Sequence, residues 1–284
     1  MATEIAALLE EGVRRLARHS DQPRIEAEIL LAAALGKPRS YLLAHPEERI
    51  LDCEATDRYE AHVTRRSHGE PVAYILGTRE FWSLPLEVGP GVLIPRPETE
   101  LLVELALTRL PADAPCRVLD LACGSGAVAL ALAQECPGAR IVATDVADAA
   151  LDLTRRNAAR LGLGNVDVRG GSWFEPVAGE RFDLIVSNPP YIATDDPRVE
   201  PGVRRYEPPG ALFAGPTGLE ALAVVAAGAP QHLRPGGWLI VEHGDRQGHD
   251  VRALFERAGL TDVRTVRDLA DLDRCTEGRL PGGA

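Results

Sequence analysis

The first third of the chain carries apolar residues at the spacing of amphipathic helices. One set recurs every three or four positions near the N-terminus, and a second set follows before a break at Gly36 and Pro38. The two sets are Ile5, Leu8, Leu9, Val13, Leu16 and Ala17, then Ile25, Ala27, Ile29, Leu30 and Leu31. A third helical stretch covers 52–67, so the pattern predicts a small helical bundle over residues 1–73.

Between residues 74 and 95 the pattern changes to short extended pieces separated by turn residues. The turn residues are Gly77, Pro85, Gly89, Pro90 and Gly91. This punctuation predicts a β-hairpin linker. A helix over 99–110 then begins the second domain, which we expect to span 96–284.

After Pro115, strand-like runs alternate with helical stretches. The expected strands are 117–120, 140–145, 166–169, 182–187, 238–242 and 263–267, and the expected helices are 127–134, 149–161, 218–231 and 250–258. This alternation predicts an α/β domain with a doubly wound, mostly parallel sheet. Such sheets bind their ligands at the carboxyl ends of the strands.

Composition narrows the class of protein. The 284 residues are 45% hydrophobic and 26% charged, and no apolar run approaches the roughly 20 residues of a membrane-spanning helix. Because the N-terminus lacks a signal-peptide pattern, we expect a cytoplasmic protein without membrane contact. We also expect a monomer. The net charge of −11 argues against a stable nucleic-acid partner, since such binding relies on basic surface. The five cysteines show no C-x-x-C spacing, so no metal site is predicted.

A glycine-rich turn follows the first strand of the second domain, in VLDLACGSGAVALALA. Gly124 and Gly126 let backbone N–H groups and the positive end of a helix approach a ligand. With Ala129 they also satisfy the G-x-G-x-x-A pattern of dinucleotide sites, which is weak evidence alone. Asp120, however, would repel a pyrophosphate and suit a cationic group, and Asp145 can accept hydrogen bonds from ribose hydroxyls. S-adenosylmethionine has a ribose and a sulfonium but no phosphate, so it fits both carboxylates.

Each of these residues has a structural alternative. Asp120 can cap a helix or loop, Asp145 can cap the helix after it, and Cys123 is expected to serve packing only. His243 at a strand end, and Phe81 with Trp82 in the linker, are expected to have structural roles as well.

The run SNPPYIATDD places two prolines directly after a buried strand. Prolines stiffen the loop and donate no backbone hydrogen bond, so the loop offers oxygens and withholds N–H groups. The Asn188 side-chain oxygen and the Pro189 carbonyl can then accept from both N–H groups of a primary amide. Tyr191 supplies a flat surface for stacking. The loop therefore predicts methyl transfer to a planar –NH2 group, with a rigid turn lacking chemistry as the alternative.

The chain closely resembles the bacterial peptide chain release factor N5-glutamine methyltransferases, the PrmC/HemK family, over nearly its whole length. The resemblance is carried by GEPVAYILGTREFWSLPLEV, IPRPETELLVELAL, LDLACGSGAVALALA, NPPYI and YEPPGALFAG. NPPY alone is shared with adenine-N6 methyltransferases, whereas REFW and PRPETE together are far more specific. The resemblance implies a Rossmann-like class I S-adenosylmethionine-dependent methyltransferase domain, with a small N-terminal helical bundle that docks the substrate and a β-hairpin linker.

The resemblance also implies an activity and its residues. S-adenosylmethionine would methylate N5 of the glutamine in the Gly-Gly-Gln motif of class I release factors, leaving S-adenosylhomocysteine. The implied cofactor contacts are Asp120, Ala122, Cys123, Gly124, Ser125, Gly126, Asp145 (ribose), Trp173 (adenine) and Asn188. The implied substrate contacts are Asn188, Pro189, Pro190, Tyr191 and Arg96, with Asn188, Pro189 and Tyr191 catalytic.

Two positions depart from the family pattern. Ser172 stands where an acidic residue is usual, which puts a carboxylate contact to the adenine amino group in doubt. Ala122 replaces the more usual Gly, a change that predicts a φ below zero at this position.

Three other functions compete. A glutamine methyltransferase for a ribosomal protein would share the same loop. An adenine-N6 nucleic-acid methyltransferase would need a basic recognition domain, which this acidic chain lacks. A non-catalytic binding module would not need both the glycine-rich turn with its carboxylates and a complete Asn-Pro-Pro-Tyr.

Overall fold

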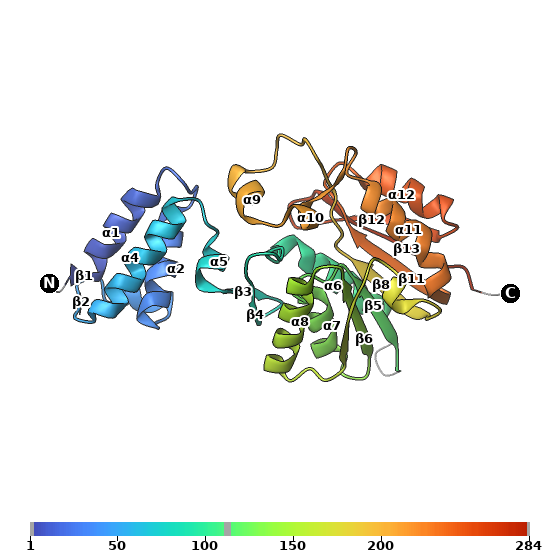
Figure 1. The fold of residues 1–284 in the computed structure, drawn as a ribbon, viewed down its shortest axis with the longest axis horizontal. Helices are drawn as coiled ribbons and strands as arrows, with labels where there is room; N and C mark the ends of the chain where they lie inside the picture. Colours follow the sequence, from blue (N-terminus) through green and yellow to red (C-terminus); the bar gives the residue numbers. More distant parts are fainter. Residues whose placement is uncertain (1–2, 111–114, 283–284) are drawn as a thin grey trace. The chain divides into compact units, whose positions relative to one another are not determined.

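The computed structural model describes residues 3–110 and 115–282, and the chain divides into two compact units, Met1–Thr78 and Arg79–Ala284 (Figure 1). Each unit has a hydrophobic core of its own. In the part of the chain that is described, no helix combines the length and the apolar character needed to cross a membrane.

The N-terminal unit is helical, as the apolar spacing predicts. Its elements are β1 (Thr3–Glu4), α1 (Ile5–Leu16), α2 (Pro23–Leu35), α3 (Arg39–Ala44), β2 (Arg49–Ile50), α4 (Cys53–Ser67) and α5 (Val72–Leu76). Leu9 of α1, Leu30 of α2 and Tyr59 of α4 meet in its core. The Tyr59 hydroxyl, buried with them, donates to the Leu8 carbonyl oxygen at 3.2 Å.

The linker departs from the prediction at its start. Tyr74, which the pattern predicts to be extended, lies instead in α5, which starts directly after Pro71 and ends at Gly77 with a φ of 71°. β3 (Thr78–Phe81) and β4 (Leu84–Glu87) then form the two-stranded sheet of the expected hairpin. Phe81 is buried and Trp82 packs against the same core, which agrees with their predicted structural role.

The C-terminal unit confirms the predicted α/β fold. Its first elements are η1 (Pro97–Thr99), α6 (Glu100–Arg109), β5 (Arg117–Leu121), α7 (Ala127–Glu135), β6 (Arg140–Asp145), α8 (Asp148–Leu161), β7 (Val166–Gly170), η2 (Glu175–Val177) and β8 (Phe182–Ser187). The rest are β9 (Ile192–Ala193), α9 (Pro201–Tyr206), α10 (Pro209–Leu212), β10 (Phe213–Gly215), α11 (Glu220–His232), β11 (Leu233–Glu242), α12 (Gly248–Arg257), β12 (Thr261–Arg267) and β13 (Asp273–Arg279). The main sheet has seven strands in the order β12-β13-β11-β8-β5-β6-β7.

Alternate residues of the central strands face two separate cores. Val118 of β5 and Leu184 of β8 belong to the core that includes residues of α6 and α7. Leu119 and Ile185, one position further along, belong to the core that includes residues of α11 and α12. Burial on both faces is what parallel strands of this fold class require.

Within the main sheet, the sequence-based prediction missed β13; it also missed the short strands β1, β2, β9 and β10, which lie outside this sheet. β13 runs antiparallel to both β11 and β12, so the sheet is parallel only from β11 to β7. Its sequence, DRCTEGR, shows neither an apolar run nor an apolar alternation. Its buried positions are filled by Cys275, Thr276, Glu277 and Gly278. The polar groups of Thr276 and Glu277 find their partners only in the folded chain.

Glu277 joins three elements of the sheet edge. Its fully buried carboxylate accepts from Arg109 at the end of α6 (3.0 and 2.5 Å) and from Arg264 on β12 (2.5 Å). Burial acts to raise the pKa of Glu277, but the hydrogen bonds from both guanidinium groups outweigh it and hold the pKa below its ordinary value.

Replacing Glu277 by Gln should lower the free energy of unfolding by about 3 kcal/mol near neutral pH, because both arginines lose their carboxylate. The folded pKa lies below the unfolded value of 4.5, so the stabilisation is complete above that pH and is lost as pH falls through the folded pKa. Denaturant titrations of both proteins at neutral and acidic pH measure this. A difference that stays constant into strong acid would contradict the ion-pair account.

Candidate active site

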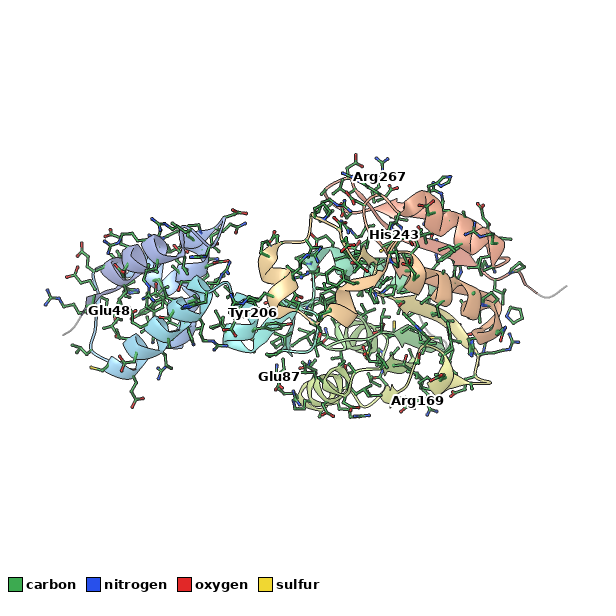
Figure 2. All side chains as sticks on the ribbon, turned by 45° about the horizontal axis from the view of Figure 1, so that its top comes forward. Glu48, Glu87, Arg169, Tyr206, His243 and Arg267 are labelled. Carbon is green, nitrogen blue, oxygen red and sulfur yellow. The ribbon has the colours of Figure 1, made fainter. Side chains whose placement is uncertain are left out.

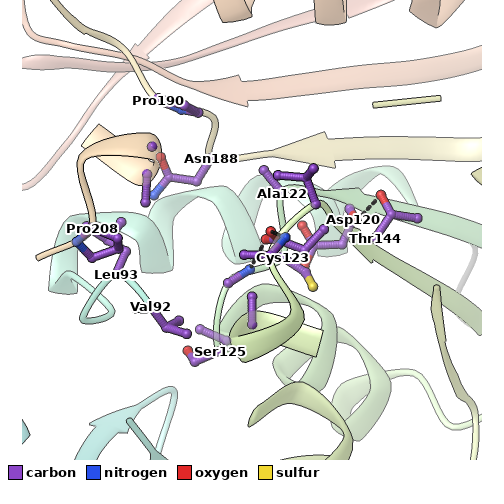
Figure 3. Close-up of a pocket in the computed structure, with 18 of the residues that line it drawn as sticks. Val92, Leu93, Asp120, Ala122, Cys123, Ser125, Thr144, Asn188, Pro190 and Pro208 are labelled. Carbon is purple, nitrogen blue, oxygen red and sulfur yellow. Dashed lines mark hydrogen bonds between the residues drawn. The ribbon is translucent and has the colours of Figure 1, made fainter. Parts of the chain in front are cut away.

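A cavity of about 280 Å³ lies where β5, β6 and β8 end (Figure 3). Its lining comes from residues 91–96 and Thr99, the glycine-rich turn and the start of α7, the ends of β6 and β7 with the residues after them, Asn188 with Pro190, and the segment 208–211. The cavity thus occupies the carboxyl edge of the sheet, where the sequence predicts a ligand.

The glycine-rich turn reverses the chain tightly between β5 and α7. Ala122, Gly124 and Gly126 have φ values of 59°, 58° and 83°. The prediction of a φ below zero at Ala122 is therefore wrong: the turn imposes a left-handed conformation that costs an L-residue about 1 kcal/mol. Gly126 does not line the cavity, and a Cβ there would lie 2.8 Å from Thr154 Cγ2, so this glycine serves packing.

Asp120 both caps a helix and lines the cavity. Its Oδ2 accepts from Ala129 N, in the first turn of α7, at 3.0 Å. Burial raises the pKa of Asp120 to about 8, opposed by this hydrogen bond and reinforced by the charge of Asp145. A cationic group in the cavity would favour the ionised form. Asp120 therefore caps α7, as the structural alternative requires, and at the same time faces the cavity, as its predicted ligand role requires.

Asp145 fixes the turn from the next strand. Its Oδ2 accepts from Gly124 N and its Oδ1 accepts from Ala147 N, both at 2.9 Å, and Ala147 immediately precedes α8. Each carboxylate oxygen keeps a lone pair beyond these bonds. Because Asp145 also lines the cavity, ribose hydroxyls remain its predicted partners.

Three further predicted cofactor residues line the cavity: Cys123, Ser125 and Trp173. Cys123 is buried 3.6 Å from Thr154 Oγ1, and burial raises the pKa of its thiol well above the usual value, as a packing role requires. Ser125 is buried, and its hydroxyl has no hydrogen-bond partner among the described residues. Trp173 has a φ of 46°, a conformation rare for a bulky residue, and packs partly against the α11–α12 core.

Asn157 of α8 is a residue that the sequence-based prediction missed. It is fully buried, accepts from Glu87 N (2.7 Å), and donates to Glu87 O and Ser125 O (both 3.0 Å). Glu87 ends the hairpin (Figure 2) and also pairs with Arg156 and Arg160. One amide therefore joins the linker to the glycine-rich turn. The available signal was a polar residue in the predicted helix 149–161.

Arg96 lies in the lining but is already paired. Its guanidinium binds the buried carboxylate of Glu207, whose other oxygen accepts from Ile94 N at 3.1 Å. Pro208, Gly210 and Ala211, which also line the cavity, follow Glu207 directly in the chain. Arg96 thus fixes this wall of the cavity, and its predicted contact to substrate stays a prediction.

The Asn-Pro-Pro-Tyr loop begins at Asn188, directly after Ser187, the last residue of β8. Asn188 and Pro190 line the cavity, whereas Pro189 and Tyr191 are not in its lining. The Asn188 side chain donates through Nδ2 to Thr99 Oγ1 at 3.1 Å. The Tyr191 hydroxyl donates to Glu242 at 3.0 Å, and its ring packs on the α11–α12 core, so its stacking role stays a prediction.

The donor set fits S-adenosylmethionine better than a dinucleotide. In the lining drawn from the described residues, the one cationic side chain, Arg96, is neutralised by Glu207. A pyrophosphate at the glycine-rich turn would face Asp120 and Asp145 without a compensating charge. A sulfonium, an amino group and ribose hydroxyls would all find suitable partners there.

His243 has the structural role expected of it. It is fully buried, with Nδ1 2.9 Å from Gly244 O and Nε2 2.8 Å from Thr276 Oγ1. Burial lowers the pKa of His243, so the ring is held neutral by its surroundings.

Comparison with known proteins identifies relatives along most of the chain. Residues 7–77 match the PrmC N-terminal domain and residues 98–200 match the methyltransferase small domain. A release factor glutamine methyltransferase of Xylella fastidiosa (strain Temecula1) is 53% identical, over 91% of this chain and 94% of that protein. The Escherichia coli (strain K12) protein with the same name is 46% identical, over 95% and 97%. A solved methyltransferase from Pyrococcus furiosus shares the fold, with a TM-score of 0.53 at 18% identity over 78% of this chain and 98% of that one.

Replacing Asp145 by Ala should weaken binding of S-adenosylmethionine about tenfold or more, because hydrogen bonds to a charged acceptor contribute about 1.5–3 kcal/mol. Asp145→Asn removes the charge but keeps one oxygen that can accept from Ala147 N. Comparing it with Asp145→Ala separates the effect of the lost charge from the effect of a disturbed turn. Asp148→Ala, which removes an exposed carboxylate outside the lining, is the matched control. Calorimetry measures each dissociation constant, and an unchanged value for Asp145→Ala would refute the ribose assignment.

Proposed function

The chain belongs to the release factor glutamine methyltransferase family, and from this premise we propose what it does. It transfers a methyl group from S-adenosylmethionine to N5 of the glutamine in the Gly-Gly-Gln motif of class I peptide chain release factors. The observation that carries this proposal is the hydrogen bond from Asn188 Nδ2 to Thr99. Because Asn188 Nδ2 donates to Thr99, the Asn188 side-chain oxygen is the end of the amide that can accept a hydrogen bond from a substrate.

A glutamine side chain carries two N–H donors on a nitrogen whose lone pair is conjugated with the carbonyl. Asn188 Oδ1 and the Pro189 carbonyl oxygen accept from these two donors and hold the nitrogen in one position. Two fixed acceptors reduce the entropy that must be lost on reaching the transition state. They also stabilise the positive charge that develops on the nitrogen as it bonds to carbon.

The cofactor site supplies the other reactant in a fixed place. When bound, S-adenosylmethionine supplies an electrophilic methyl group on a sulfonium. Asp145 would hold the ribose, Asp120 would face the cationic part, and Trp173 would border the adenine. The methylated nitrogen is acidic, so its proton leaves to water and no strong base is required.

The N-terminal helical unit, which we predict over residues 1–73, docks the release factor in this proposal. The match of residues 7–77 to the PrmC N-terminal domain supports a release factor as substrate over a ribosomal protein. The acidic charge of −11 argues against an adenine in nucleic acid as the methyl acceptor. The proposal includes a cytoplasmic location, since translation factors act in that compartment, and a monomeric protein.

Replacing Asn188 by Ala should lower the single-turnover rate of methyl transfer by about 10²–10³-fold, because one of two pre-organised acceptors is lost. Asn188→Asp keeps an oxygen and should fall between the wild type and Asn188→Ala. The affinity for S-adenosylmethionine should change much less than the rate. The assay uses labelled cofactor with release factor, ribosomal protein and DNA side by side, and mass spectrometry of the product.

Thermal melts separate the chemical role of Asn188 from a structural one. If Asn188 only stabilises the turn before Pro189, the Ala variant loses stability but the folded fraction keeps its rate. A folded Asn188→Ala protein that methylates glutamine at the wild-type rate contradicts the two-acceptor mechanism. Label on DNA or on the ribosomal protein alone contradicts the substrate assignment.

A further inference from the structure

The glycine-rich turn is held by one face of α8. Thr154 Oγ1 donates to the Gly124 carbonyl oxygen and Asn157 Nδ2 donates to the Ser125 carbonyl oxygen, both at 3.0 Å. Thr154 and Asn157 are three positions apart, so they lie on the same side of the helix. Both side chains are fully buried, and neither lines the cavity. Two consecutive carbonyl groups of the turn therefore point towards α8 and not into the cavity.

The donor and the acceptor in each of these bonds are identified by their partners. A carbonyl oxygen can only accept, so the Thr154 hydroxyl donates to Gly124. The Glu87 N–H can only donate, so the Asn157 atom that it meets at 2.7 Å is the amide oxygen. Asn157 Nδ2 then directs its two N–H bonds at the carbonyl oxygens of Glu87 and Ser125, each at 3.0 Å. A half-turn of the Asn157 amide would break all three of its bonds.

The peptide group between Gly124 and Ser125 has a defined polarity as a result. In a trans peptide the C=O and N–H bonds point to opposite sides. Because the Gly124 oxygen is turned to Thr154, the Ser125 N–H is turned the other way. The backbone alone does not decide this, since the reversed peptide would bring Ser125 to a positive φ, a strain that Ala122 already bears in the same turn with a φ of 59°. The Thr154 hydroxyl therefore selects between two orientations of this peptide.

Ser125 lies where the turn meets the cavity (Figure 3). It is 2% exposed, and its hydroxyl has no hydrogen-bond partner among the described residues. A buried hydroxyl without a partner is uncommon, because the cost of its desolvation is not offset. The neighbouring N–H groups are occupied, since Gly124 N donates to Asp145 and Gly126 N donates to the Cys123 carbonyl oxygen at 2.8 Å. A ligand that carries acceptor oxygens would therefore be bound at Ser125.

We propose that Thr154 and Asn157 are positioning residues for the methyl donor. They hold the carbonyl groups of the turn on the α8 side and so direct the Ser125 N–H, and not a carbonyl oxygen, at the carboxylate of S-adenosylmethionine. The adenosine part of the cofactor carries no carboxylate and does not depend on this arrangement. The inference rests on the proposed function for the identity of the cofactor, and it is independent of the methyl acceptor.

The central test is Thr154→Val, which keeps the shape of the side chain and removes the hydroxyl. Calorimetry compares S-adenosylhomocysteine, which carries the carboxylate, with methylthioadenosine, which has the same adenosine and sulfur without the amino acid part. The dissociation constant of S-adenosylhomocysteine should rise about tenfold, because a hydrogen bond to a charged acceptor is weakened. That of methylthioadenosine should stay at the wild-type value. An equal rise for both ligands would overturn the proposal, since a turn that is merely disturbed also affects the ribose predicted at Asp145.

Thr154→Ser separates the hydrogen bond from packing. A Cβ on Gly126 would lie 2.8 Å from Thr154 Cγ2, so this methyl group packs closely against the turn. Serine keeps the donor and loses the methyl group, whereas valine keeps the packing and loses the donor. Thr154→Ser should therefore bind S-adenosylhomocysteine nearly as tightly as the wild type does, even where its melting temperature falls. A Thr154→Ser protein that binds this ligand as weakly as Thr154→Val would contradict the account.

Asn157→Asp tests the second contact of α8 with the turn. The carboxylate keeps an oxygen for Glu87 N and places an acceptor where Asn157 donates to Ser125 O. The affinity for S-adenosylhomocysteine should fall as in Thr154→Val, and the affinity for methylthioadenosine should be kept. A folded Asn157→Asp protein with unchanged affinity for both ligands would remove Asn157 from the proposal. If this variant does not fold, the two Thr154 variants decide the question.

Asn165→Asp is the matched control for Asn157→Asp. Asn165 Nδ2 donates to the carbonyl oxygens of Ala133, Cys136 and Ala139, and none of these residues lines the cavity. The control should lose stability and keep both dissociation constants. A loss of affinity for S-adenosylhomocysteine alone in this control, equal to that of Asn157→Asp, would reduce the effect at Asn157 to general destabilisation.

The backbone amide of Ser125 gives a readout that does not depend on activity. In nitrogen-labelled protein, its magnetic resonance signal should shift when S-adenosylhomocysteine binds and much less when methylthioadenosine binds. Thr154→Val should abolish this difference. A wild type that binds S-adenosylhomocysteine but methylates no release factor refutes the proposed substrate and leaves this inference standing. A Ser125 signal that responds equally to both ligands in the wild type refutes this inference, whatever the activity.

Discussion

The pairing of β5 with β8 is the constraint on which the site depends. Leu121 and Ser187 lie opposite each other at the ends of these parallel strands, and the Ser187 hydroxyl donates to the Leu121 carbonyl oxygen at 2.8 Å. The glycine-rich turn starts one residue after Leu121, and the Asn-Pro-Pro-Tyr loop starts one residue after Ser187. A shift of register by one residue would turn the side chains of one strand to the opposite faces of the sheet and displace its loop relative to the other. The distance between the glycine-rich turn and the Asn-Pro-Pro-Tyr loop is therefore fixed by a core that is buried on both faces.

Buried polar side chains then hold the linker against this edge. Asn157 joins Glu87 to the glycine-rich turn, and Glu207 joins Arg96 and Ile94 to the segment that carries Pro208. Such groups are costly to bury unless their hydrogen bonds are made, so they favour a single arrangement of the linker. This explains three residues of the PRPETE stretch. Arg96 donates to Glu207. Thr99 accepts from Asn188, and Glu100 accepts from Trp82 N.

The sequence predicted the parts of the structure that follow from local pattern. Periodicity was sufficient for the helical bundle, the alternating elements and the carboxyl-edge location of Asp120, Asp145 and Asn188. It failed at Ala122, because a left-handed residue is set by the closure of a turn and not by its own preference. It failed at β13, because a glutamate in the sequence indicates an exposed position. Glu277 is buried only because the fold places Arg109 and Arg264 beside its carboxylate. Thr99 and Asn188, whose side chains are hydrogen-bonded, are 89 positions apart, so no spacing rule relates them.

A structure of the protein with S-adenosylhomocysteine and a Gly-Gly-Gln peptide tests the central claim most directly. The account predicts that the glutamine nitrogen lies within hydrogen-bond distance, about 2.7–3.2 Å, of both Asn188 Oδ1 and the Pro189 carbonyl oxygen. It also predicts that Asn188 Nδ2 keeps its bond to Thr99 in the complex. A glutamine that turns its carbonyl oxygen towards Asn188, or an Asn188 that presents its –NH2 to the substrate, would contradict the account.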